Sequence, residues 1–154
     1  MSRAFVKESD GADGDALAEL QVSPHRNLVT AEGLAQIEAQ VERLRGELSA
    51  ARAAEDRATV QRVQRDLRYW SERQRTAELV RAVSSGDKAR FGSLVTLVRP
   101  DGRRLEYRIV GEDEADPAGG KISYVSPIAG RLIGAAAGDE IELPDGSAEI
   151  LEVR

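Results

Sequence analysis

Asp and Glu are the side chains that this sequence offers for catalysis or metal binding. Of 154 residues, 27 are Asp or Glu, one is His and none is Cys. Without Cys there is no disulfide and no thiolate-bound zinc or iron–sulfur site. His25 lies between Pro24 and Arg26 in a polar stretch and has no neighbour to orient it as a base. We therefore expect a solvated loop histidine, and any chemistry has to come from acids.

Glu55 and Asp56 are the acids of greatest interest, because they alone lie near the helix-to-helix turn expected in the stretch AARAAEDRA (50–58). Adjacent residues on a helix point in different directions, so the two carboxylates could converge on a hard cation only if they lie in a turn. Alternatively, Asp56 caps the N-terminus of a helix and Glu55 complements the dipole of that helix. The spacing favours the cap and leaves the metal-assisted role open.

The stretch around these acids has the periodicity of paired helices. After Thr30, a suitable N-cap, a first apolar stripe follows at spacings of three and four: Leu34, Ile37, Val41, Leu44 and Leu48. A second, out-of-phase stripe comprises Val60, Val63, Leu67, Trp70, Gln74 and Ala77. A turn near residues 50–57 would let the stripes bury each other in an antiparallel helical hairpin. A dimeric coiled coil of long helices is the alternative, because no Gly or Pro marks the turn.

The C-terminal part has the two-residue period of β-strands. The expected strands are SLVTLV (93–98), RRLEYRIVG (103–111), KISYV (121–125), EIEL (140–143) and SAEILEV (147–153). Pro-Asp-Gly turns at 100–102 and 144–146 join two pairs of them. A short helix is expected from Pro127 to Gly134. The sequence thus predicts an α+β fold: a helical hairpin followed by a small antiparallel sheet with one helix across it.

These patterns divide the chain into a flexible acidic arm (1–27), a helical hairpin (28–83), a linker (84–90) and a sheet domain (91–154). The arm is too poor in apolar residues to offset its ordering entropy. The formal net charge of −5 argues against autonomous binding of duplex nucleic acid. Because no apolar run could span a bilayer and no secretion signal is apparent, we expect a cytoplasmic protein.

Four motifs in a fixed order carry a resemblance to a known family. They are LVTAEGL (28–34), YRIVGEDEAD (107–116), ISYVSPIAGRLIG (122–134) and GDEIEL (138–143). Over about residues 28–153 the chain resembles the bacterial GreA and GreB transcription elongation factors. The resemblance implies an FKBP-like sheet domain that clamps the rim of the secondary channel of RNA polymerase. It also implies a coiled coil that enters the channel, where its tip acids hold Mg²⁺ and water while a backtracked transcript is cut.

The resemblance also implies roles for particular residues. The candidate site residues are the catalytic tip acids Glu55 and Asp56, the RNA contacts Arg57 and Arg62, and the polymerase contacts Asp113, Glu114, Ser126 and Pro127. The alternative for the arginines is a solvated face paired with acids of the first helix. No metal is intrinsic, because any Mg²⁺ would be shared with the polymerase active site. We expect a monomeric accessory factor, not an enzyme, that meets nascent RNA only within the polymerase complex.

The tip departs from the family pattern. GreA and GreB carry a Gly-Asp…Glu-Asn-Ala stretch there, which this chain lacks. Its hairpin is also shorter by roughly eighteen residues, which is about 13 Å less reach at the rise of an α-helix. Val125, just before Ser126, replaces a residue that is usually polar in the family. Two functions stay open: stimulation of cleavage, or occupation of the channel rim without cleavage, as in the short-hairpin relative Rnk, a regulator of nucleoside diphosphate kinase.

Two further classes of function are alternatives to these. A prolyl isomerase needs a concave apolar pocket, usually lined by aromatic residues. The sheet domain contains only Phe91, Tyr107 and Tyr124 as aromatics, which disfavours that activity. A plain coiled-coil scaffold would be a dimer, whereas the hairpin predicts a monomer.

Overall fold

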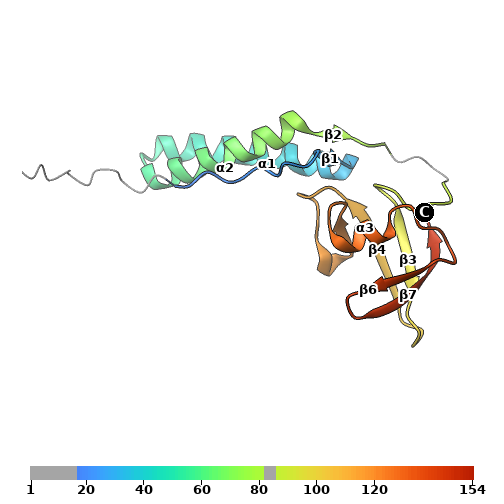
Figure 1. Cartoon of the computed structure of the whole chain (residues 1–154). Helices are drawn as coiled ribbons and strands as arrows, with labels where there is room; N and C mark the ends of the chain where they lie inside the picture. The colour runs from blue at the N-terminus through green and yellow to red at the C-terminus, as the bar shows by residue number, and fades with distance from the viewer. Residues whose placement is uncertain (1–16, 82–85) are drawn as a thin grey trace, which may run out of the picture.

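A pair of helices and a five-stranded sheet make up the computed structural model of the chain (Figure 1). It describes residues 17–81 and 86–154. Most of the predicted acidic arm (1–16) lies outside the described residues, as do residues 82–85, at the end of the predicted hairpin and the start of the predicted linker. An α+β fold with an N-terminal helical pair and a C-terminal sheet domain was predicted, and it is confirmed.

The two helices are α1 (Ala31–Ala53) and α2 (Arg57–Thr76). The Thr30 hydroxyl accepts a hydrogen bond from the Gly33 amide at 3.0 Å and so begins α1. Asp56 does the same for α2, accepting from the Thr59 amide at 3.1 Å. The chain reverses without Gly or Pro because Glu55 adopts a left-handed backbone conformation, with φ +55°. The antiparallel hairpin is confirmed by the 3-residue turn between the helices.

The predicted apolar stripes form the contact between the helices. Leu44 and Leu48 of α1 pack against Val63 of α2, all three buried. Around them lie Val60, Leu67 and Trp70, which are partly buried. Burial of each such aliphatic side chain stabilises the fold by about 1.5–3 kcal/mol relative to exposure, so the stripes hold the hairpin closed.

A two-stranded parallel sheet that the sequence did not predict ties the two ends of the hairpin together. It consists of β1 (Leu28–Val29) and β2 (Glu78–Leu79). The Glu78 amide donates to the Asn27 carbonyl at 2.8 Å, and the Val80 amide donates to the Val29 carbonyl at 2.9 Å. The chain therefore enters and leaves the hairpin at the same place.

The sheet domain has the strand order β5-β4-β3-β7-β6. The strands are β3 (Leu94–Val98), β4 (Arg104–Val110), β5 (Lys121–Ser123), β6 (Glu140–Leu143) and β7 (Gly146–Val153). A 3₁₀ turn, η1 (Pro117–Gly119), precedes β5, and the helix α3 (Pro127–Leu132) follows it. The sheet is mixed, not wholly antiparallel as predicted, because β5 runs parallel to β4. The loop 111–120 carries the chain back beside β4 before β5 begins, whereas a tight hairpin would have reversed it.

The core of this domain lies between the sheet and α3. Val95, Leu97, Ile109 and Ile150 are fully buried on the inner face of the sheet. From α3, Ala129 and Leu132 pack against the same cluster. Alternation along the strands thus places one face on the core and leaves the other in solvent.

Candidate functional site

The tip acids lie at the end of the hairpin that points away from the sheet domain (Figure 1). Both are exposed, but Asp56 is engaged locally. Its two carboxylate oxygens accept hydrogen bonds from Thr59, one from the amide at 3.1 Å and one from the hydroxyl at 2.6 Å. The hydrogen bond from the Thr59 hydroxyl, followed by that from its amide, holds the pKa of Asp56 below its usual value.

Two acids do not make a metal site by themselves. Among residues 17–81 and 86–154, no group of three or more His, Asp or Glu side chains could hold a metal ion. Glu55, whose backbone is in the left-handed conformation, lies beside Arg52 and Arg57 at the tip. The N-cap predicted for Asp56 is present, and the catalytic role of the pair stays a prediction.

Loss of the Asp56 cap should lower stability in a pH-dependent way. Asp56→Ala leaves the first amides of α2 without an acceptor, so we expect the melting temperature at neutral pH to fall by about 2–4 °C. Because the folded pKa of Asp56 is depressed below 3.8, the cap is fully effective above the unfolded value and weakens as the pH falls through the folded value. Melting curves from about pH 7 to about pH 2.5 should show the two proteins converging. A constant difference over that range would contradict this assignment.

The two candidate RNA contacts differ in their surroundings. Arg57 begins α2 and is exposed at the tip, where no ion pair is found for it within the described part of the chain. Arg62 pairs with Glu47 of α1 at 2.5 Å and lies 3.8 Å from Asp66. Arg62 thus matches the alternative of a solvated arginine paired across the hairpin, whereas Arg57 is open to a ligand. Contact with RNA stays a prediction for both.

Ser126 and Pro127 form the corner between β5 and α3. The Ser126 hydroxyl accepts from the Ala129 amide at 3.3 Å, and Pro127 occupies the first turn, where its missing amide costs nothing. Pro127 is exposed, and Ile133, just after α3, is 42% exposed. The exposure of Ile133 was not predicted. Since α3 is less than two turns long, Leu132 takes the core-facing position and its neighbour Ile133 points elsewhere.

Asp113 lies at the joint between the hairpin and the sheet domain. One of its oxygens pairs with Arg73 Nε of α2 at 2.5 Å, and the other accepts from the Tyr69 hydroxyl at 2.6 Å. Glu112 lies 3.7 Å from the same Arg73 guanidinium, whose side chain is 2% exposed. Burial, and then the hydrogen bond to Asp113, raise the pKa of Tyr69 to about 12. Arg73 is therefore a buried charge that joins the domains, although it lies in a helix rich in exposed arginines.

Glu114 also faces the hairpin. It accepts from the Thr30 hydroxyl at 2.6 Å, next to the start of α1, and lies 3.7 Å from Lys121 Nζ. Its side chain is only 3% exposed. Both predicted polymerase contacts, Asp113 and Glu114, are thus occupied within the chain, and their contact with a partner stays a prediction. Sequence reasoning missed Arg73 and Tyr69, because no local pattern marks their partners 40 and more residues away.

Comparison with known proteins identifies the sheet domain. A family model described as the C-terminal domain of the GreA/GreB transcription elongation factors matches residues 84–154. GreB of Neisseria meningitidis serogroup B is 41% identical over 92 residues, which cover 57% of this chain and 56% of that protein. GreA of Rhizobium etli is 51% identical over 74 residues, covering 45% of this chain and 47% of that protein. The sheet domain is a GreA/GreB C-terminal domain. The predicted resemblance is confirmed.

The family model covers the sheet domain, and the chain spans about half the length of the curated relatives it matches. Among solved structures, Gfh1 of Thermus thermophilus is 22% identical, with a TM-score of 0.41, and the match covers 84% of this chain and 99% of that one. A GreA/GreB factor of Nitrosomonas europaea is 22% identical, with a TM-score of 0.40, covering 82% and 97%. No helix of the described residues is long and apolar enough to cross a membrane.

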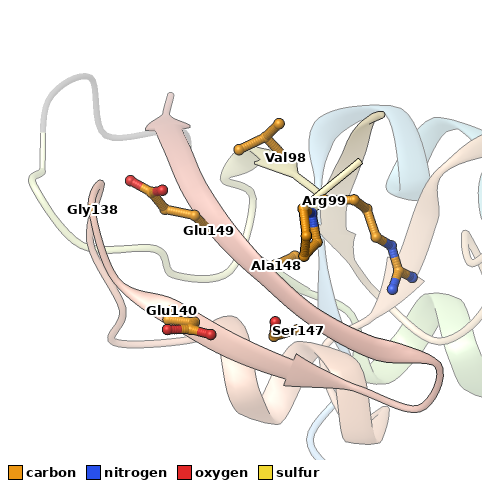
Figure 2. A pocket seen from close by; sticks show the side chains of 8 residues that line it. Val98, Arg99, Gly138, Glu140, Ser147, Ala148 and Glu149 are labelled. Atoms are coloured by element: carbon orange, nitrogen blue, oxygen red, sulfur yellow. The ribbon is translucent and has the colours of Figure 1, made fainter. Parts of the chain in front are cut away.

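A hollow on the outer side of the Gre-family sheet bears on the isomerase alternative (Figure 2). It is lined by Val98, Arg99, Pro100, Gly138, Glu140, Ser147, Ala148 and Glu149. Glu140 and Glu149 stand directly opposite each other on β6 and β7, and Arg99 is paired with Asp145. None of the lining residues is aromatic, and two like charges face each other there. This hollow is not the apolar pocket that a prolyl isomerase needs.

Proposed function

We propose that this chain is a Gre-family transcription elongation factor that binds RNA polymerase at the secondary channel and modulates elongation. The observation that carries the proposal is the GreA/GreB C-terminal domain at residues 84–154, with the Pro127 corner exposed on its surface. An exposed Pro at a rigid strand-to-helix corner offers a partner a preformed apolar contact with little entropy to lose.

The hairpin is built to act as an arm held in a fixed direction. Its helices of 23 and 20 residues are about 34 and 30 Å long at the rise of an α-helix. The pair between Arg73 and Asp113, together with the β1–β2 sheet, joins the base of the arm to the sheet domain. Docking of the sheet domain on the polymerase would therefore also direct the arm. Its tip would present Glu55, Asp56 and Arg57 to the part of the polymerase channel that the arm enters.

In the proposed complex the chain is a monomer that holds no metal of its own. Any Mg²⁺ belongs to the polymerase active site, and RNA is met only inside the complex, first by Arg57 and then by Arg62. The exposed position of Arg57 at the tip supports this order.

Substitution of the corner should weaken polymerase binding. Pro127→Glu places a charge where the proposed contact is apolar, and we expect the affinity for core RNA polymerase to fall at least about tenfold. Pro144→Glu, at an exposed Pro in the turn between β6 and β7, is the matched control and should leave the affinity unchanged. Fluorescence anisotropy of labelled protein titrated with polymerase measures both. Equal affinity of the two variants for polymerase would show that the Ser126–Pro127 corner is not part of the contact.

The tip favours the non-cleaving form of this function. Both oxygens of Asp56 accept hydrogen bonds from Thr59, which hold this carboxylate against the start of α2 and away from a shared site with Glu55. Cleavage by a shared Mg²⁺ would need acids that converge on the metal at coordination distance. A factor that occupies the channel rim and alters elongation without cutting RNA satisfies the geometry better.

Transcript cleavage in backtracked elongation complexes tests this second candidate. We expect cleavage rates within about twofold of those without factor, under conditions where binding is saturated and a GreB control accelerates cleavage. Glu55→Ala/Asp56→Ala should then change neither binding nor cleavage. Strong cleavage that this double variant abolishes, with binding retained, would instead make the chain a cleavage factor.

A further inference from the structure

The segment of residues 17–26, which we call the strap, lies along the hairpin before β1 begins (Figure 1). Glu19 of the strap makes a two-pronged ion pair with Arg68 in the middle of α2: Arg68 Nε donates at 3.0 Å, and Nη2 donates to the second oxygen. Arg68 has no other ion pair in the described part of the chain. The strap thus neutralises one arginine of α2 and covers the side of the helix on which it lies.

The end of the strap near the joint is held firmly. The Ser23 hydroxyl donates to Glu112 at 3.0 Å, and the Tyr124 hydroxyl donates to the Arg26 carbonyl at 2.5 Å. The next residue, Asn27, is buried and donates to the Arg73 carbonyl at 2.7 Å, whereas the pair of Arg26 with Glu78 is exposed and adds little. These contacts involve the hairpin base and the sheet domain at once. They fix the point from which the rest of the strap extends.

The other end of the strap is held weakly. Glu19 and Arg68 have exposed side chains, at 62% and 57%, and ion pairs in such positions contribute little. Leu17, Leu20 and Val22 are each about 40% exposed, so their apolar surface is only partly covered. Segments with few buried contacts and exposed polar pairs open locally at low cost. The strap can therefore release residues 17–22 while residues 23–27 keep their hold.

We propose that residues 17–22 are a releasable part of the strap that shields the Arg68 side of α2 in the free protein and has to leave α2 before the hairpin can enter the polymerase channel. This inference rests on the proposed function. With the strap in place the arm is three chain segments wide, and the charge of Arg68 is engaged by Glu19. Release narrows the arm to its two helices and frees Arg68 for the phosphates of the complex.

The absence of Cys from the chain allows the strap to be locked chemically. Glu19→Cys/Arg68→Cys, joined by a short bis-maleimide crosslinker, gives the locked form. The same variant blocked with a monofunctional maleimide is its control. Glu19→Lys, which places two positive charges together, gives the released form. Glu38→Lys, at an exposed acid of α1, matches its change in charge. Affinity for backtracked elongation complexes is measured for each form and for the unmodified chain.

We expect locking to weaken binding at least about tenfold relative to the blocked control, because the closed state cannot bind. Glu19→Lys should bind about two- to fivefold more tightly than the unmodified chain, as expected for loss of one exposed ion pair, and Glu38→Lys should not. Equal affinity of the locked and blocked forms would overturn the proposal that the strap has to be released, and would leave the proposed binding to polymerase unaffected. Failure of every form to bind would overturn the proposed function, and the strap with it.

Discussion

Arg73→Met is expected to lower the free energy of unfolding by about 3–5 kcal/mol, the cost of removing one partner from a buried ion pair. The Arg73 guanidinium is buried between Asp113, at 2.5 Å, and Glu112, at 3.7 Å. Met fills a similar volume but leaves two acids at the joint without their cation. The cost arises from these uncompensated carboxylates more than from the lost attraction.

Urea denaturation followed by the fluorescence of Trp70, the sole tryptophan, measures this effect in the hairpin itself. Arg75→Met is the matched control two residues further along α2, since Arg75 is 70% exposed and, among the described residues, pairs only with Glu72 of the same helix. Its effect should be small beside that of Arg73→Met. Similar midpoints for the two variants would show that the joint does not depend on Arg73. Arg73→Met/Asp113→Leu should recover part of the loss, because it removes one of the stranded charges.

Gly111→Ala is expected to cost about 1–3 kcal/mol, the range for forcing an extra methyl into a packed site. Gly111 directly follows β4, and a Cβ built there would lie 2.4 Å from the Leu28 carbonyl oxygen. That neighbour is backbone of β1, so it cannot rotate away as a flexible side chain could. The methyl group has to push β1 away from the sheet domain, which strains the joint between them.

Gly46→Ala provides the control with the opposite sign. Gly46 lies on the exposed side of α1, and a Cβ there would meet nothing within 4 Å. Ala inside an exposed helix is more favourable than Gly by about 0.5–1 kcal/mol, so this variant should be more stable than the unmodified chain. Thermal unfolding of the three proteins gives the comparison. If Gly111→Ala also gained stability, the close approach of β1 to the sheet domain would be disproved.

Much of the fold follows from local sequence patterns. The stripes around Leu44 and Val63 determine which helix faces meet, and Thr30 and Asp56 begin the helices where predicted. The strand boundaries agree with prediction to within two residues, because alternation and Pro-Asp-Gly turns are local signals. The direction of β5 could not be predicted in this way, since alternation looks the same in parallel and antiparallel strands.

Local sequence patterns also predicted some residues of the candidate site and missed the contacts of others. Sequence motifs identified the corner at Ser126 and Pro127, which is a local turn, and they marked Glu55 as a residue of the tip. They gave no sign that Asp113 and Glu114 turn inward to the hairpin, because their partners in α2 and at Thr30 lie 40 to 84 residues away. Residue type alone indicated exposed acids, as it does for most Asp and Glu side chains.

The sequence by itself thus determined the two-part architecture, the helix caps, the apolar core and the resemblance to the Gre family. Each of these depends on residues close together in the chain or on motifs in a fixed order. Only the tertiary structure decided that Arg73 is buried, that Gly111 touches β1 and that Glu19 pairs with α2. Each of these is a contact between residues far apart in the sequence. Burial and pairing depend on what a side chain packs against, and the neighbours of that side chain in the sequence do not specify this.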